Sequence, residues 1–332
     1  MPDKRRLYYE DIKGVYAIMP TPALENADQV NASFTVDLDE SARAAEALVR
    51  DGVDAIMING TFGEAATLTD DEWRQFTKTV IETVNGRIPV IAGPTTLNTR
   101  TTIERAVFAK DAGAQGLLLG RPMWNELSPK QTVDFHKTIA ENVPELGIVV
   151  YNNPAAFKSR ITPSVWKELA KIPQVVAAKY GQVDLDFRDA FTHVKGSIQL
   201  MPIETDWLTA RYWFAEEAQA CWSGGASCDP VPVIILRDAF FSGDITRAKE
   251  ITEKLAETYK TFFPKGDPNQ FRIHTIQLEK IRMDAAGYMK AGPCRPPYHM
   301  VPEEYAKGAR TAGIKWMDLA NELRRTRSRL QP

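Results

Sequence analysis

The sequence predicts an α/β protein, a (β/α)8 TIM barrel followed by a C-terminal helical extension. Short apolar runs of strand length alternate with segments whose apolar residues recur at helical spacing. This alternation occurs eight times, at intervals of about 25–30 residues, which is typical of a (β/α)8 barrel. No Gly-x-Gly-x-x-Gly follows the first apolar run, so the alternative, a doubly wound dinucleotide-binding sheet, has no support.

The predicted strands are short, and turn residues separate most of them from the helices that follow. They cover residues 14–19, 54–59, 88–93, 116–120, 147–151, 175–181, 197–201 and 218–222. The helices that follow them lie at about 37–51, 70–85, 98–112, 128–142, 163–171, 184–193, 205–215 and 230–241. Asp37 or Asp39 is a suitable N-cap for the first helix, and Thr69 and Asp70 begin the second.

The strand pattern stops at residue 242, and three further helical segments follow at 245–262, 270–290 and 302–328. A proline-rich break at 292–297 separates the last two. We therefore expect an N-terminal extension at 1–13, a barrel at 14–242 and a C-terminal helical region at 243–332 that packs on the barrel.

Composition excludes several classes of protein. The formal net charge is −2, with 41 basic and 43 acidic residues, so no global field favours a nucleic acid or an anionic membrane as partner. No run approaches 18 apolar residues, and residues 1–13 lack the apolar segment of a signal peptide. The three cysteines are widely spaced, which argues against disulfides and a zinc site. We expect a soluble, cytoplasmic protein.

The sixth strand, at residues 175–181, carries a lysine after four apolar or small residues. A strand buried on both faces does not ordinarily hold an ammonium group. Lys179 could extend its charged end to water, or it could be a desolvated neutral amine able to attack a carbonyl. The other strand ends bear on this choice, because in such a barrel they meet at one mouth.

Those strand ends contain no cluster of histidine, cysteine or aspartate, so we expect no metal and no cofactor. The glycine-framed turn at 60–64 could bind a carboxylate through its backbone N–H groups and the Thr61 hydroxyl, or it could serve geometry alone. Tyr151 could be an acid/base or a rim aromatic. Trp124 and Trp222 could stack on an aromatic substrate or only pack. The lysine, tyrosine and anion-binding turn at one mouth favour the catalytic interpretation.

These motifs also resemble a known family. The turn at 60–64, the Tyr-Asn-x-Pro at 151–154 and Lys179 on the sixth strand are similar to the motifs of the N-acetylneuraminate lyase and dihydrodipicolinate synthase family of class I aldolases. The family's second turn hydroxyl is Phe62 here. Trp124 replaces the tyrosine that members lend to a neighbouring subunit, and Ala156 replaces the arginine of the synthases.

Further segments resemble the trans-o-hydroxybenzylidenepyruvate hydratase-aldolase group of that family. They are residues 19–22, 60–64, 122–124, 278–287 and 292–298. Ile203 and Thr275 depart from the naphthalene-pathway members, which have a histidine and an asparagine there. The identity of the substrate's aromatic ring is therefore left open by the sequence.

The resemblance implies a lysine Schiff-base reaction that releases pyruvate and an aromatic aldehyde from an arylidene-pyruvate and water. Lys179 would be the nucleophile and Tyr151 the general acid/base. Thr61 and Phe62 would hold the carboxylate, Asn153 would orient water or the substrate hydroxyl, and the ring would lie near Trp222, Trp124, Ile203 and Thr275. The resemblance also implies a homotetramer. The alternatives are another pyruvate-dependent aldolase or synthase of the family, or a non-enzymatic binding protein on a barrel scaffold.

Overall fold

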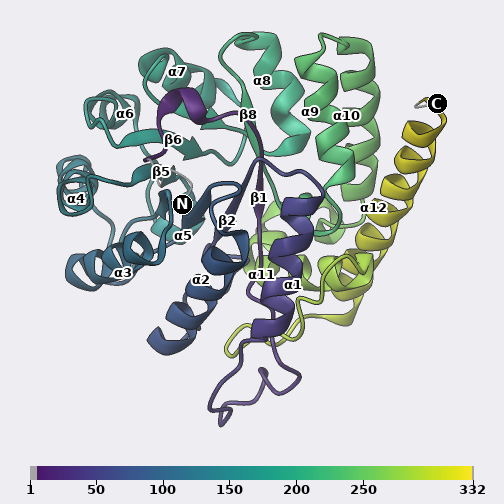
Figure 1. Cartoon of the computed structure of the whole chain (residues 1–332), viewed down its shortest axis with the longest axis horizontal. Helices are drawn as coiled ribbons and strands as arrows, with labels where there is room; N and C mark the ends of the chain where they lie inside the picture. The colour runs from purple at the N-terminus through teal and green to yellow at the C-terminus, as the bar shows by residue number, and fades with distance from the viewer. Residues whose placement is uncertain (1–5, 331–332) are drawn as a thin grey trace. The chain divides into compact units, whose positions relative to one another are not determined.

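The computed structural model of the chain describes residues 6–330. Its strands form one parallel sheet in the order β7-β6-β5-β4-β3-β2-β1-β8 (Figure 1). The strands are β1 (Gly14–Ile18), β2 (Ala55–Ile58), β3 (Val90–Ala92), β4 (Gly116–Leu119), β5 (Gly147–Tyr151), β6 (Val175–Lys179), β7 (Gln199–Met201) and β8 (Ala220–Ser223). Every residue of these strands is buried, as expected where helices cover a parallel sheet.

The two edge strands of this order, β7 and β8, are joined just beyond the end of β7. Ile203 and Trp222 form a parallel bridge, and the Trp222 N–H donates to the Pro202 carbonyl at 2.9 Å. Each of the eight strands is at the position that the sequence predicts. The predicted TIM barrel is therefore confirmed.

The helices begin and end close to their predicted bounds. The longer ones are α1 (Leu38–Arg50), α2 (Asp70–Val84), α3 (Thr99–Ala112), α4 (Pro129–Asn142), α6 (Pro163–Leu169), α7 (Leu185–Val194), α8 (Trp207–Trp213), α9 (Val231–Phe241), α10 (Ile245–Tyr259), α11 (Pro268–Ala286) and α12 (Glu303–Leu330). Asp37 is the N-cap of α1, since its carboxylate accepts from the Glu40 N–H at 2.9 Å. Short 3-10 turns are η1 (Tyr9–Asp11), η2 (Glu204–Asp206), η3 (Gly225–Ser227) and η4 (Pro264–Gly266).

Two local features were not expected from the sequence. A four-residue helix, α5 (Pro154–Phe157), follows β5 directly, with Asn153 as its N-cap. It ends at Lys158, whose φ of 61° lies in the left-handed region. The second is in α11, which has a non-helical residue at His274. The first feature, α5, could not be predicted because four residues are too few to show helical periodicity.

The chain divides into two compact units. The first contains the N-terminal residues up to Tyr16, Asp54–Ile58 and Val84–Trp222, and in it α3, α4, α6 and α7 follow one another as neighbours outside the strands (Figure 1). The second contains Ala17–Val53, Asn59–Thr83 and the chain from Ser223 onward, and in it α9 lies beside α10 and α11 beside α12. The predicted domain bounds at residues 13 and 242, and the packing of the C-terminal region on the barrel, stay predictions.

Candidate active site

Lys179 is the last residue of β6 and is only 7% exposed. Its Nζ lies 3.3 Å from the centroid of the Trp222 ring and 5.0 Å from that of the Tyr151 ring. Tyr151 is directly opposite Lys179 in the β5–β6 register, so the two side chains point the same way from neighbouring strands. The structure therefore brings together the lysine and tyrosine that the sequence singled out.

The indole of Trp222 is fixed beside the amine. Its Nε1–H donates at 2.6 Å to the carbonyl of Tyr180, the residue that follows Lys179. The ring is 6% exposed and its strand is bridged to Ile203. Trp222 thus presents a rigid apolar face against the Lys179 Nζ, which removes water from that side of the amine.

Asn153 holds the phenol of Tyr151 as well as the helix that follows. Its Nδ2 lies 3.4 Å from the Tyr151 hydroxyl, at the long end of the hydrogen-bond range, and its Oδ1 accepts from the Ala156 N–H at 3.2 Å. The side chain thereby couples the start of α5 to the phenol. Asn153 therefore has a structural partner in addition to the predicted contact with water or substrate.

Phe157, which no pattern in the sequence indicates, packs against Tyr151. The two rings meet edge to face with centroids 5.4 Å apart. The Phe157 ring occupies the place that a Cβ would take at Gly120, at only 2.1 Å from its Cζ. Gly120 directly follows β4. The contact between this glycine and the Phe157 ring cannot be predicted from either residue type alone.

The loops after β4 and β5 are joined by two hydrogen bonds from cationic side chains. Arg121 donates from Nη2 to the Ser159 carbonyl at 2.7 Å, and Lys158 donates from Nζ to the Trp124 carbonyl at 2.6 Å. Burial lowers the pKa of Arg121 to about 10. The Trp124 side chain itself is 74% exposed in the single chain, so its predicted contact with the substrate stays a prediction.

The turn at residues 60–64 belongs to the second unit and immediately follows β2. Thr61 accepts from the Glu64 N–H at 3.0 Å, and Phe62 is buried. The carbonyl of Gly63 accepts from the Thr21 hydroxyl at 2.7 Å. The turn is well fixed within its unit, and its predicted binding of a carboxylate stays a prediction.

Thr275 lies on α11, next to the distorted residue His274. Its hydroxyl donates to the Phe271 carbonyl at 2.9 Å, a bond within its own helix. Arg272, on the same helix, is exposed to solvent. The predicted contact of Thr275 with the substrate ring stays a prediction.

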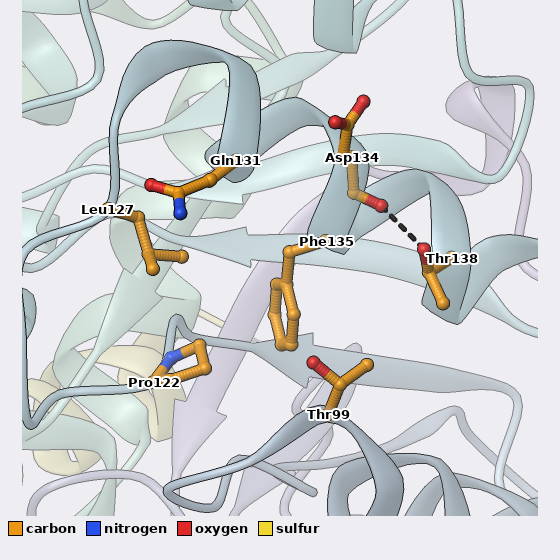
Figure 2. Close-up of a pocket in the computed structure, with 7 residues that line it drawn as sticks. All are labelled: Thr99, Pro122, Leu127, Gln131, Asp134, Phe135 and Thr138. Atoms are coloured by element: carbon orange, nitrogen blue, oxygen red, sulfur yellow. Dashed lines mark hydrogen bonds between the residues drawn. The ribbon is translucent and has the colours of Figure 1, made fainter.

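A separate pocket of about 290 Å³ lies between the start of α3, the loop after β4, and α4 (Figure 2). Figure 2 shows the Phe135 ring between Pro122 and Thr99, with the Thr138 hydroxyl donating to the Asp134 carbonyl. None of the proposed site residues lines it. Within residues 6–330, no group of three or more His, Cys, Asp or Glu side chains is arranged to hold a metal ion, and no helix there is long and apolar enough to cross a membrane.

The fold and the site define the protein as a TIM barrel with a buried lysine at the end of its sixth strand. A tyrosine and a tryptophan flank this lysine. Residues 28–312 match the model of the dihydrodipicolinate synthetase family. The chain belongs to this family.

Individual relatives narrow the comparison. The chain is 45% identical over 330 residues to a trans-O-hydroxybenzylidenepyruvate hydratase-aldolase of Pseudomonas aeruginosa, covering 96% of this chain and 97% of that one. It is 42% identical over 310 residues to a trans-2'-carboxybenzalpyruvate hydratase-aldolase of Nocardioides sp. strain KP7, covering 92% and 93%. Among solved structures, PhdJ bound to a substrate intermediate has a TM-score of 0.94 at 45% identity, covering 96% of this chain and 99% of that one.

Proposed function

We propose that the protein is a lysine Schiff-base hydratase-aldolase, a lyase that converts an aryl-substituted 2-oxobut-3-enoate and water into an aromatic aldehyde and pyruvate. The observation that carries the proposal is the position of Lys179, whose Nζ is buried against Trp222 and close to Tyr151. The hydratase-aldolases that match nearly the whole chain support the choice of reaction. The reaction takes place in the degradation of polycyclic aromatic hydrocarbons.

The first step forms the covalent intermediate. The neutral amine of Lys179 attacks the 2-keto carbon, and loss of water from the carbinolamine gives an iminium conjugated with the alkene. Tyr151 donates and accepts the protons of this step, since its ring is 5.0 Å from the amine and Asn153 lies within reach of its hydroxyl. The protein itself supplies the electron sink, so the scheme needs no cofactor.

The second step adds water and cleaves the carbon chain. The iminium makes the benzylic carbon electrophilic, water adds there, and a proton adds at the neighbouring carbon. Tyr151 then removes the proton of the new hydroxyl, the carbon–carbon bond breaks, and the aldehyde leaves while the electron pair remains as an enamine. Protonation and hydrolysis of the enamine release pyruvate and restore the Lys179 amine.

Substrate orientation is assigned to the remaining predicted residues. The backbone N–H groups of Thr61 and Phe62 and the Thr61 hydroxyl bind the carboxylate. The aryl ring lies along Trp222, with Trp124, Ile203 and Thr275 toward its far end. Asn153 orients the attacking water through the same amide that contacts the Tyr151 hydroxyl.

Reductive trapping tests the proposal directly. Incubation with pyruvate and borohydride should place one reduced pyruvyl group on Lys179, located by peptide mass spectrometry. Lys179→Ala should lose both the adduct and turnover, while the matched control Lys130→Ala, at a largely exposed lysine, should keep both. An adduct on another lysine, or full turnover by Lys179→Ala, would overturn the mechanism. Tyr151→Phe should lower kcat by about 10²–10⁴-fold.

A different pyruvate-dependent aldolase or synthase of the family is the second candidate. The 4-hydroxy-tetrahydrodipicolinate synthases match this chain at 29–30% identity, below the 45% of the hydratase-aldolases. The rings of Trp222 and Phe157 beside Lys179 and Tyr151 suit an aromatic substrate better than a polyhydroxylated one. Pyruvate release from a panel of arylidene-pyruvates, compared with sugar acids, separates the two. Faster release from the sugar acids would assign the second function.

We also propose that the enzyme is cytoplasmic and a homotetramer. The three cysteines (Cys221, Cys228 and Cys294) are buried and form no disulfide, which suits a reducing compartment. The tetramer is supported by the family resemblance. Light scattering of the purified protein tests it, and a monomeric mass would refute it.

A further inference from the structure

Two C-terminal segments that the proposed mechanism does not use meet at one buried carboxylate in the second unit. Residues 278–287 contain Lys280, and residues 292–298 contain Arg295. Both side chains bind Glu64, the last residue of the turn at 60–64. The segments that single out the hydratase-aldolase resemblance therefore converge on the turn assigned to the substrate carboxylate.

Both oxygens of the Glu64 carboxylate are occupied. Lys280 Nζ and Arg295 Nη1 each donate to Oε2 at 2.6 Å, and the Arg295 backbone N–H donates to Oε1 at 2.7 Å. The three side chains are between 0% and 3% exposed. Charge-assisted hydrogen bonds in such a dry setting are short and strongly directional.

The charges around this group balance. Arg295 Nε donates to the Thr35 hydroxyl at 2.6 Å, and that hydroxyl lies 2.5 Å from Oε1 of Glu72. The two buried cations, Lys280 and Arg295, thus face two carboxylates. Both contact Glu64 directly, and Arg295 reaches Glu72 through the Thr35 hydroxyl. Burial lowers the pKa of Lys280, and the neighbouring charge of Glu64 opposes this effect. Removal of one member would leave a buried charge without compensation.

The Glu64 backbone shows what this arrangement achieves. Its φ of 51° is left-handed, a conformation that a residue with a side chain adopts only where its surroundings hold it. Its N–H donates to the Thr61 carbonyl at 3.0 Å, which closes a turn over residues 61–64. The left-handed Glu64 backbone and the hydrogen bond to the Thr61 carbonyl thus belong to one turn conformation, and the buried Glu64 side chain anchors its last residue.

We propose that Lys280 and Arg295 are positioning residues that preorganise the carboxylate-binding turn through Glu64. The inference rests on the proposed function, because it deepens the role assigned to Thr61 and Phe62. It makes the C-terminal segments part of substrate recognition, although neither cation touches the substrate.

The test compares pyruvate with methyl pyruvate, which lacks the carboxylate charge, as probes for borohydride trapping on Lys179. In Glu64→Gln the half-saturating pyruvate concentration should rise about tenfold, the effect expected when hydrogen bonds to a charged group are misaligned. The value for methyl pyruvate and the maximal adduct yield should stay unchanged. The matched control is Asp229→Asn, which makes the same chemical change at a buried, arginine-paired carboxylate and should alter neither value.

A second pair of variants keeps the test valid where Glu64→Gln fails to fold. Lys280→Gln retains the Glu64–Arg295 pair, so it should raise the half-saturating pyruvate concentration by less than Glu64→Gln does. Lys280→Arg keeps the positive charge and should bring this concentration part of the way back to that of the unmodified protein. Equal shifts for both probes, or no shift in either variant, would overturn the positioning role. Absence of any adduct in the unmodified protein would instead refute the proposed function.

Discussion

The pairing of Gly120 with the Phe157 ring gives a sharp prediction for activity. In Gly120→Ala the new Cβ would lie 2.1 Å from Cζ and 2.6 Å from Cε1 of Phe157. Ordinary carbon contacts need about 3.5–4.0 Å, so the ring has to retreat by about 1.5 Å. Phe157 is 4% exposed, so it has little free space, and overpacking of this kind costs about 1–3 kcal/mol.

The displaced ring should carry the effect to Tyr151. The two rings are in edge-to-face contact at 5.4 Å, so a moved Phe157 leaves the phenol without its support. A misplacement near 1 Å at a catalytic group can lower the rate about 10²-fold. We therefore expect kcat for pyruvate release to fall by this order in Gly120→Ala, with a free energy of unfolding reduced by the overpacking cost.

A double-mutant cycle with Phe157→Leu tests the mechanism. The smaller side chain relieves the clash. The free energy of unfolding of the double variant should therefore be about 1–3 kcal/mol higher than the sum of the single effects predicts. Its kcat should also be higher than the two single variants predict. The free energies come from denaturant titration, and kcat comes from a coupled pyruvate assay. Gly181→Ala, where the added Cβ meets nothing within 4 Å, is the control. Additivity of the two effects, or an unchanged kcat in Gly120→Ala, would refute the reasoning.

Two further predictions concern stability. Burial lowers the pKa of His136 from 6.5 to about 4, so between these values the unfolded chain binds more protons, and stability should fall by about 3 kcal/mol as pH drops from 6.5 to 4. His136→Gln should flatten this dependence in denaturant titrations, whereas His193→Gln, at an exposed histidine, should retain it; equal slopes would contradict the assignment. Gly225→Ala should destabilise the protein by about 1–3 kcal/mol, because its Cβ would lie 2.1 Å from the Trp316 ring; an unchanged thermal midpoint would contradict this.

The barrel and the pairing of its central side chains could be predicted because their signals are local. Each strand is a short apolar run, and the strand ends of a parallel barrel meet at one mouth. Lys179 and Tyr151 are the last residues of adjacent strands and lie in register, so identifying the two strands was enough to place the two side chains together.

The contacts that hold the turn at 60–64, and those that hold Tyr151, could not be predicted, because each joins segments that are distant in the sequence. Glu64 is 216 residues from Lys280 and 231 from Arg295, and no local pattern connects them. The place of Phe157 depends on a four-residue helix without periodicity and on a missing Cβ at Gly120. The sequence reports which residue types reach the mouth, and tertiary packing decides which of them touch.

The rings around the lysine bear on the choice between aromatic and sugar-like substrates. Trp222 directs its N–H to the Tyr180 carbonyl, and Phe157 has no polar atom, so both present apolar surface beside Lys179 and Tyr151. A polyhydroxylated chain there would leave hydroxyl groups without hydrogen-bond partners, at a cost of about 1–3 kcal/mol for each buried group. An aryl ring loses nothing of this kind and gains stacking area. We therefore expect unsatisfied polar groups to be the source of any discrimination against sugar acids. Trp222→Gln should then improve turnover of the polar substrate relative to the aromatic one, measured as pyruvate release, and an unchanged ratio would contradict this account.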